Sequence, residues 1–591
     1  MKTATVNKFL VFLVSVLSTS KSNILVNGGA AEQCVHTDQI EDDKPLIVCK
    51  EIVTLMELLN SVNFPNMPVL NTLDISYGSI RKIEDRAFDG LYNLRQLNLS
   101  GNSLENISPN YFAGLEFGKL LDLDISSNEI KTLAANDFQY LTSLQVLNIS
   151  DNWLPNLKLD TFRGLRSLQK LYSFNNDIKE LDENVFADLI SLELLDLSRN
   201  SIVLMDGGGF PQLQYLSLRK NHIEISSCNI LDMPALQTLD ISSGSVREIE
   251  DHTFDDFSNL LWLNLSSNSI KTITPYSFAG PLGDSLLHLD ISLNGIKSLA
   301  ANTFQHLSRL QILDISGNGL TTLDVDTFRG LYSLRKLYLF NTGIRDLESD
   351  VFANLDALDT LDLSRNSLVT LDGSIFGPKP LLKLRQIMLN SNNLRFLHPL
   401  SFSSLPNLEY LSLSNNYLDM LDANMFAPMQ FLQKLHLSFN LFEELPSDVL
   451  DNLNNISELL IDHNKLTFLP DVKATFPSLQ KVSLEGNPWQ CPCLNGIQSW
   501  LSYRQIQYLP ESGPYFNGKK PLCVVTATTE CIKSLSLVRK HNIVDFLALG
   551  LLGKQKRLVL DVYHEIYELF PFCMMKYLVK RYESGANHLA Q

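Results

Sequence analysis

Apolar residues recur along most of this chain in the spacing L-x-x-L-x-L-x-x-N-x-L. The pattern starts at Leu70 and returns roughly every 24 residues as far as Leu479. Within each copy, the central L-x-L alternates between apolar and polar positions. This alternation predicts a short β-strand whose leucines point inward and whose intervening side chains face solvent.

Two further positions mark the copies. An asparagine follows each strand from Asn102 to Asn487, except where Gly78, Gly244 or Thr342 replaces it. Its amide group can satisfy backbone groups that a tight turn would otherwise leave unpaired. A phenylalanine recurs on the return side of the copies, from Phe88 to Phe426, and we expect these rings to stack as an aromatic spine.

One copy cannot bury its own apolar edge, but stacked copies share a continuous core. Strands packed about 4.8 Å apart on one edge, with bulkier return segments on the other, force the stack to bend. We therefore expect an α/β solenoid, a curved horseshoe with a concave parallel β-sheet, over residues 70–486 in about 17 repeats.

A longer repeat is superimposed on the short one. A shift of 166 residues brings Leu73 onto Leu239, Leu168 onto Leu334 and the unusual Gly78 onto Gly244. We infer that a block of seven repeats has been duplicated. The duplication either only lengthens the scaffold or supplies two similar binding surfaces.

Charge and the first residues indicate the environment of the protein. The chain carries a net charge of −17, with 45% hydrophobic and 19% charged residues. Its acidity disfavours nucleic acid and bare membrane as partners. Residues 1–20 have the pattern of a signal peptide: Lys2 and Lys8 accompany an apolar run from Phe9 to Leu17. No later run has the length of a transmembrane anchor, so we expect a secreted, extracellular protein.

The eight cysteines are Cys34, Cys49, Cys228, Cys491, Cys493, Cys523, Cys531 and Cys573. Six of them lie at the two ends of the repeat region. Cys34 and Cys49 bracket a short segment in residues 21–69, which we interpret as an N-terminal cap closed by a Cys34–Cys49 disulfide. Zinc is an alternative for the later four, but Cys491-x-Cys493 is closer than zinc spacing and a signal peptide favours disulfides. We expect no metal and no cofactor.

The run from Asn487 to Leu494, followed by Trp500-Leu501, Cys523 and Cys531, resembles the C-terminal cap of extracellular leucine-rich-repeat proteins. The span from Cys34 to Cys531 is similar to the ectodomains of Toll-like receptors, to chaoptin-like and Slit-like proteins, and to the acid-labile subunit. The resemblance implies a cap over residues 487–531 with bonds Cys491–Cys523 and Cys493–Cys531. It also implies a ligand on the concave face.

Aromatic side chains at outward strand positions are candidate ligand contacts, because exposed aromatics on a rigid sheet are typical interface anchors. The alternative is local packing against neighbouring strands. The candidates are Tyr172 and Phe174 in one repeat, Tyr215 two repeats on, and Tyr338 with Phe340 in the duplicated block.

Aspartates form a second candidate set at the central outward position. They are Asp74, Asp124, Asp196, Asp240, Asp290, Asp314 and Asp362, and we select Asp290, Asp314 and Asp362 as ligand-binding residues. Such a ladder favours a basic or hydroxyl-rich partner. The alternative is a solvated strand pattern, because each Asp precedes a Ser by two residues.

Glycosylation signals limit the part of the strand face that a ligand could reach. Asn98, Asn106, Asn148, Asn264 and Asn455 each begin an N-x-S sequence. By repeat register, Asn98, Asn148 and Asn264 lie on the strand face. Glycans there would shield the nearby repeats and leave Tyr172–Tyr215 and Asp290–His436 open to a ligand.

Residues 532–591 form the tail. Val559, Val562, Ile566 and Leu569 have helical spacing, so we expect an amphipathic helical tail. It either packs on the C-terminal cap or forms a homodimer with Cys573 as an intermolecular disulfide. Cys228 is interpreted as a buried thiol.

A catalytic role is not expected. Gly283-Asp284-Ser285-Leu286 and Asp561-Val562-Tyr563-His564 spell the motifs of an esterase family, but Leu286 is a repeat leucine and the context is wrong. The sequence favours a secreted recognition protein that binds a protein or glycoprotein, in immunity or ligand carriage. A cell-adhesion or extracellular-matrix component resembling chaoptin or Slit is the alternative.

Overall fold

The computed structural model describes residues 70–115, 119–204, 209–223, 233–470, 476–508, 523–524 and 530–532, and the backbone of 34–37 and 46–49. Two compact units divide the chain: Met1–Tyr417 with Asn424–Leu432, and Leu418–Ala423 with Gln433–Gln591. The expected signal peptide, the expected helices of the tail, Cys228 and Cys573 lie outside the described residues.

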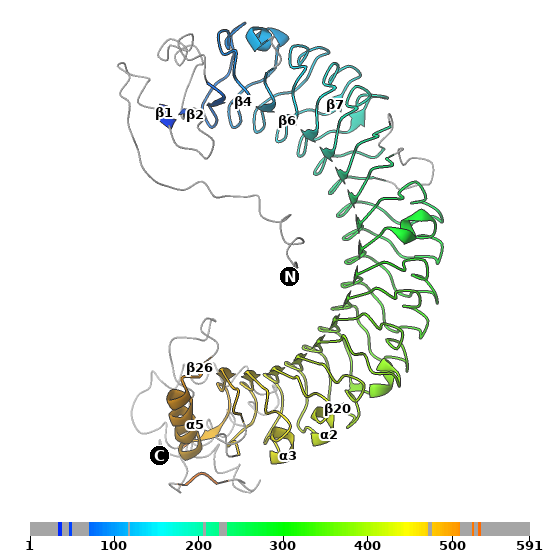
Figure 1. Cartoon of the computed structure of the whole chain (residues 1–591), viewed down its shortest axis with the longest axis vertical. Coiled ribbons are helices and arrows are strands. Elements are labelled where there is room, and N and C mark those ends of the chain that lie inside the picture. Colours follow the sequence, from blue (N-terminus) through cyan, green and yellow to red (C-terminus); the bar gives the residue numbers. More distant parts are fainter. Residues whose placement is uncertain are drawn as a thin grey trace, which may run out of the picture. The chain divides into compact units, whose positions relative to one another are not determined.

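Short parallel strands, one from each repeat, form the main sheet of the first unit and line the inner side of its arc (Figure 1). In chain order they are β3 (Thr72–Asp74), β4 (Gln96–Asn98), β5 (Asp122–Asp124), β6 (Val146–Asn148), β8 (Lys170–Tyr172), β10 (Leu194–Asp196), β11 (Tyr215–Ser217), β12 (Thr238–Asp240), β13 (Trp262–Asn264), β14 (His288–Asp290), β15 (Ile312–Asp314), β16 (Lys336–Tyr338), β17 (Thr360–Asp362), β19 (Gln386–Met388) and β21 (Tyr410–Ser412).

The register of this sheet aligns equal positions of successive repeats. Leu73 pairs with Leu97, and Leu97 pairs with Leu123. These leucines are almost completely buried, whereas the residues on either side of them are only partly buried or exposed. The alternation predicted from the sequence is therefore confirmed, and each repeat contributes one buried aliphatic residue to the same inner row, a leucine except for Ile387 of β19.

The repeat asparagines form a buried ladder behind the strands. The Oδ1 atom of Asn152 accepts the N–H of Ile130 at 3.0 Å, and its Nδ2 donates to the carbonyls of Ile125 and Ile149 at 3.1 Å. The preceding Asn128 also donates to Ile125 O, at 3.0 Å. Each rung thus connects two repeats, which explains why an amide recurs at this position.

Phenylalanines fill the other side of the core. Phe304 and Phe328 stack with centroids 6.5 Å apart, and Phe328 and Phe352 follow at 6.0 Å. This confirms the expected spine. The return segments are mostly turns, with the 3-10 helices η3 (Pro109–Leu115), η4 (Pro281–Asp284) and η5 (Gly373–Phe376) and the short helix α2 (Ala423–Phe426). Two small sheets pair β7 (Asn156–Leu157) with β9 (Glu180–Leu181) and β18 (Thr370–Leu371) with β20 (Phe396–Leu397).

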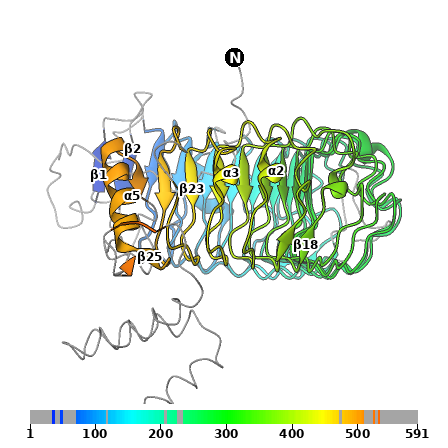
Figure 2. The same ribbon diagram turned by 90° about the horizontal axis from the view of Figure 1, so that it is seen from below.

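The second unit continues the repeat pattern and ends in a cap. Its parallel strands are β22 (Lys434–His436), β23 (Glu458–Leu460), β24 (Lys481–Ser483) and β26 (Gln507–Tyr508), with the short helix α3 (Ser447–Leu450) on the return side. Helix α5 (Cys491–Arg504) buries Leu494, Ile497, Trp500 and Leu501 at helical spacing. It lies beside β25 (Trp489–Gln490), which pairs with β27 (Cys523–Val524) (Figure 2).

The disulfide pattern of the C-terminal cap is confirmed. Cys491 is bonded to Cys523, and Cys493 is bonded to Cys531. Zinc ligation by these four cysteines is therefore wrong, because all four sulfur atoms are in disulfides. The two bonds join the first turn of α5 to Cys523 of β27 and to Cys531.

At the front of the chain, β1 (Cys34–Thr37) and β2 (Leu46–Cys49) form an antiparallel pair in which Cys34 lies opposite Cys49. Strand β2 pairs in parallel with β3. The two ends of the segment that Cys34 and Cys49 bracket therefore pair in the backbone, and the Cys34–Cys49 bond stays a prediction. Among the described helices, none has the length and apolar character needed to cross a membrane.

Candidate functional site

The concave face of the first unit, meaning the outward side chains of β3 to β21, is the candidate site. The third residue of each strand points away from the buried leucines. From β3 to β17 this residue is Asp or Asn except at Tyr172, Ser217 and Tyr338. The face is therefore a row of acidic and amide groups that two tyrosines and one serine interrupt.

The aspartates of this row hold the backbone turn after each strand. Oδ1 of Asp314 accepts the N–H of Ser316 at 2.9 Å, and Asp290 makes the same 2.9 Å bond with Ser292. Asp362 does so with Ser364 at 2.8 Å. A side chain that satisfies a backbone N–H two residues on stabilises a turn. The Asp-x-Ser pattern thus has a structural cause.

The same turn explains the sequons on the strands. Oδ1 of Asn98 accepts from Ser100 N at 3.0 Å, and Asn148 and Asn264 repeat this bond with Ser150 and Ser266. The sequence Asn-x-Ser is therefore a variant of the Asp-x-Ser turn. All three asparagines are partly buried on the concave face, whereas Asn106 is exposed in the segment after β4 and Asn455 is exposed in the second unit. Glycan shielding of the face stays a prediction.

Tyr172 and Tyr338 stand where a turn-forming carboxylate or amide would otherwise be. Neither phenol replaces the missing bond, and the N–H of Phe174 donates instead to Ser150 Oγ of the preceding repeat, at 3.2 Å. Phe174 and Phe340 are partly buried, like the two tyrosines. Each aromatic pair therefore stands where other repeats have a stabilising hydrogen bond between an Asp or Asn side chain and the backbone N–H two residues later.

In the first block, the sheet brings Tyr172, Asp196 and Tyr215 onto neighbouring strands. Tyr172 pairs with Asp196 in the β8–β10 register. Tyr215 is the first residue of β11 and lies opposite Leu194, whereas Ser217 lies opposite Asp196. Burial, and then the charge of Asp196, raise the pKa of both phenols above the ordinary value. Both tyrosines are thus neutral hydrogen-bond donors beside a carboxylate at physiological pH.

In the second block, Asp290, Asp314, Tyr338 and Asp362 are consecutive partners across β14 to β17. Their spacing in a parallel sheet is about 4.8 Å. Burial raises the pKa of Asp314, and its hydrogen bonds to Ser316 oppose that rise. The predicted aspartates and the tyrosine therefore form one contiguous acidic stretch, and their role in binding stays a prediction.

We expect the buried carboxylates to make stability depend on pH in a definite direction. Burial is the largest cause of the raised pKa of Asp196, so the folded chain binds its proton more readily than the unfolded chain does. The contribution of Asp196 to the stability of the fold therefore falls as the pH rises through its raised pKa in the folded chain. This destabilisation is absent below the pKa that Asp196 has in the unfolded chain. Asp196→Asn keeps the turn acceptor and removes the charge.

In urea unfolding, unglycosylated Asp196→Asn should be more stable than the parent at pH 7, and this advantage should shrink as the pH falls toward about 4. The circular dichroism midpoint measures it. An advantage that grows on acidification would show that the Asp196 carboxylate is instead stabilised in the fold.

Sequence reasoning missed an aromatic pair on this face. Trp262 and His288 occupy the first positions of β13 and β14 and meet edge to face, with centroids 5.7 Å apart. Burial lowers the pKa of His288. Their signal was weak, because a single Trp or His at a variable position does not repeat in the duplicated block.

Charged side chains also meet on the outward side of the second unit. His436 Nε2 lies 2.9 Å from Glu458 Oε1, and Lys481 Nζ lies 3.8 Å from Glu458 Oε2. The esterase-like serine has a structural role, because Ser285 Oγ is buried and donates to Leu260 O at 2.9 Å. His564 lies outside the described residues. No group of three or more His, Cys, Asp or Glu side chains in the described part of the chain could hold a metal ion.

Comparison with known proteins identifies the repeat. A sequence profile described as leucine rich repeat matches residues 68–117, 118–178, 173–223, 234–281, 284–344, 333–383, 382–442 and 430–488. Tsukushi of Gallus gallus is 30% identical over 215 residues, which are 35% of this chain. The match spans 57% of the length of Tsukushi.

Two solved structures share the fold. A leucine-rich-repeat protein of Leptospira interrogans has a TM-score of 0.51 at 23% identity, covering 73% of this chain and 93% of its own. Toll in the Drosophila Toll–Spatzle complex has a TM-score of 0.50 at 20% identity, covering 75% of each chain. At these identities the likeness concerns the architecture alone.

Proposed function

The chain belongs to the leucine-rich repeat family, and we propose on that premise that it is a non-catalytic recognition protein that holds an extracellular protein or glycoprotein on its concave face. The finer assignment, to immunity or ligand carriage, is part of this proposal; Toll, which shares the architecture, was solved in complex with Spatzle. An extracellular setting is supported by the two disulfides of the C-terminal cap, since such bonds persist in oxidising compartments.

The observation that carries the proposal is the exchange of turn-forming groups for aromatic pairs. At ten of the thirteen main-sheet strands from β3 to β17, an Asp or Asn side chain accepts a hydrogen bond from the turn that follows. A hydrogen bond of this kind contributes about 1 kcal/mol. Tyr172–Phe174 and Tyr338–Phe340 give it up at equivalent places in both blocks, which favours a binding role over a packing role.

Charge defines the proposed partner. The stretch from Asp290 to Asp362 presents three carboxylates around one phenol on the same row. Such a surface complements lysine, arginine and hydroxyl groups, and it repels acidic proteins. We therefore infer a partner with a basic patch, in contact with Tyr172, Phe174 and Tyr215 or with Tyr338, Phe340 and the three aspartates.

The turn pattern supplies a test at one position. In a secretory host, Asp314→Asn completes an Asn-x-Ser sequon with Ile315 and Ser316 while keeping the turn acceptor, as Asn98 does. A glycan there would project from the middle of the acidic stretch. The variant is immobilised and exposed to native extracellular fluid. The amount of partner protein that it retains should fall at least about 100-fold, the loss expected when a hot-spot region is blocked.

Asp314→Ser is the matched control, because Ser217 already occupies the same row and serine adds no glycan. It should weaken capture only a few-fold by removing one charge. Mass spectrometry of the peptide around residue 314 must confirm that the sequon is occupied. Unchanged capture by the fully glycosylated variant would exclude this stretch from the binding surface.

A further inference from the structure

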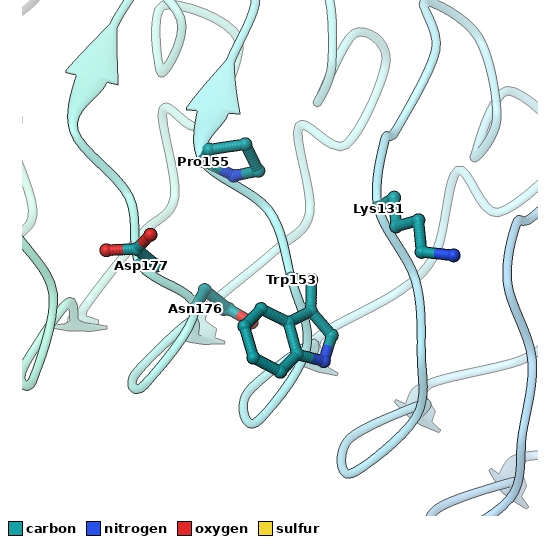
Figure 3. A pocket seen from close by; sticks show the side chains of 5 residues that line it. All are labelled: Lys131, Trp153, Pro155, Asn176 and Asp177. Carbon is teal, nitrogen blue, oxygen red and sulfur yellow. The ribbon is translucent and has the colours of Figure 1, made fainter.

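A hollow of about 280 Å³ opens in the first unit, away from the strand rows, where the chain leaves β5, β6 and β8. Lys131, Trp153, Pro155, Asn176 and Asp177 line it. The indole of Trp153 lies between Lys131 and Asp177, with Pro155 beside it (Figure 3). Its side chain is 63% exposed, so the hollow has a flat apolar floor open to solvent.

The floor of this pocket is rigid. The N–H of Trp153 donates to Ile130 O at 2.8 Å, and the next residue, Leu154, is buried in the core. Asn176 donates to Ile149 O at 3.1 Å and accepts the N–H of Asn152 at 2.7 Å. A ligand would therefore meet a backbone and an Asn176 side chain that are already ordered.

The duplicated block shows that Trp153 is not needed for folding. A shift of 166 residues places Lys297 at Lys131 but Gly319 at Trp153, Thr321 at Pro155 and Gly343 at Asp177. The N–H of Gly319 makes the same bond, to Ile296 O at 2.8 Å. The same backbone thus exists without the tryptophan, so packing does not account for the exposed indole.

Charge limits the kind of ligand. Asp177 accepts hydrogen bonds from Lys179 and Ser201, at 3.2 and 3.1 Å, and the bond from Lys179 is the main reason that its pKa lies below the usual range. A carboxylate has further acceptor sites. Lys131 is a cation on the other side, only 3.9 Å from Glu105 Oε2. Opposite charges at the two sides disfavour either a cationic or an anionic ligand.

The backbone of the lining offers little to a peptide. Main-chain N–H groups of Lys131, Trp153 and Leu154 already donate to Glu105 O, Ile130 O and Asn176 O. Pro155 has no N–H, and its carbonyl accepts from Lys179. A ligand must then be recognised by an apolar face and by side-chain donors and acceptors at its edge, and the volume suits a single ring.

We propose that this pocket binds one pyranose ring of a neutral carbohydrate, with a C–H face of the sugar on the Trp153 indole and its hydroxyls bonded to Lys131 and Asp177. A pyranose combines an apolar face with hydroxyls that both donate and accept, which matches this lining. The site is independent of the concave-face ligand, and only the first of the two blocks carries it.

Saturation-transfer NMR on the full chain, with its N-glycans trimmed, tests the proposal. The probes are the methyl β-glycosides of glucose, galactose and N-acetylglucosamine, with phosphocholine and a capped hexaproline peptide as alternatives. At least one sugar should bind with a Kd of about 1–10 mM, the range expected for a single small ring. Trp153→Gly, which copies Gly319, should remove the signal without changing the melting temperature.

The second block provides a gain-of-function arm. Gly319→Trp with Thr321→Pro and Gly343→Asp should restore sugar binding in the Trp153→Gly background, because a Cβ at Gly319 meets nothing closer than 3.5 Å. Asp177 has the positive φ that Gly343 requires. Sugar signals that survive Trp153→Gly, or binding of hexaproline or phosphocholine in place of every sugar, would overturn the proposal.

Discussion

Replacing Tyr172 and Phe174 together by alanine should reduce the affinity for the extracellular partner by at least about 100-fold, or roughly 3 kcal/mol. The reason is that rigid aromatic side chains at the centre of an interface carry most of its binding energy. Both side chains are partly buried on the concave face and do not close the turn after β8. The melting temperature should therefore change little.

Tyr338→Ala with Phe340→Ala is the equivalent change in the second block. Surface plasmon resonance with the purified partner, alongside thermal unfolding, separates a loss of binding from a loss of folding. Loss in one double variant alone assigns the ligand to one block, and loss in both indicates that the ligand spans them. Undiminished affinity in both variants would show that the concave aromatic pairs do not contribute to binding of the partner.

Asp74→Ala with Ser76→Ala is a matched control for these variants. It changes the third residue of β3 and the residue two positions later, as the aromatic variants do for β8, and it removes the 3.0 Å bond from Ser76 N to Asp74 Oδ1. We expect it to cost more stability than the aromatic variants, by about 1 kcal/mol. Partner affinity should be unaffected, because β3 lies outside both proposed contact stretches.

The second large effect concerns the fold. Asn152→Ala should lower the free energy of unfolding by about 3 kcal/mol. The N–H of Ile130 loses its acceptor in a buried environment, and the carbonyls of Ile125 and Ile149 each lose one of two amide donors. Guanidinium unfolding followed by circular dichroism measures the loss.

Asn152→Thr is the comparison, because Thr342 occupies the equivalent position and its hydroxyl donates to Leu339 O at 3.0 Å. A threonine restores one of the donors, so about half of the loss should remain. Hydrogen exchange adds a local readout, since the Ile130 amide should exchange faster in Asn152→Ala. Equal stability of Asn152→Ala and the parent would contradict the ladder.

The fold could be predicted from the sequence because the same residue types recur at the same positions of each repeat. Leu73, Asn102 and Phe88 have roles that depend on position within the repeat and on the neighbouring copy, and stacking confirms all three. The disulfide pattern of the C-terminal cap followed from a family resemblance, because four cysteines alone permit several pairings.

The candidate site was less predictable. The outward positions of Tyr172 and Asp314 followed from the repeat register. The hydrogen bond from the Ser316 N–H to the Asp314 side chain could not be predicted from the positions of the charged residues alone. The Trp153 pocket needs Lys131 and Asp177, which lie 46 positions apart in the sequence and on different repeats. Only the three-dimensional stacking brings them together.

Hydroxyl-radical footprinting of the chain alone and in complex with its partner tests the central claim most directly. We expect that Tyr172, Phe174 and Tyr215, or Tyr338 and Phe340, become protected from oxidation in the complex. Exposed side chains of the return side, such as Tyr276 and Tyr332, should oxidise equally in both samples. Protection confined to the return side, with the strand face still reactive, would contradict recognition on the concave surface.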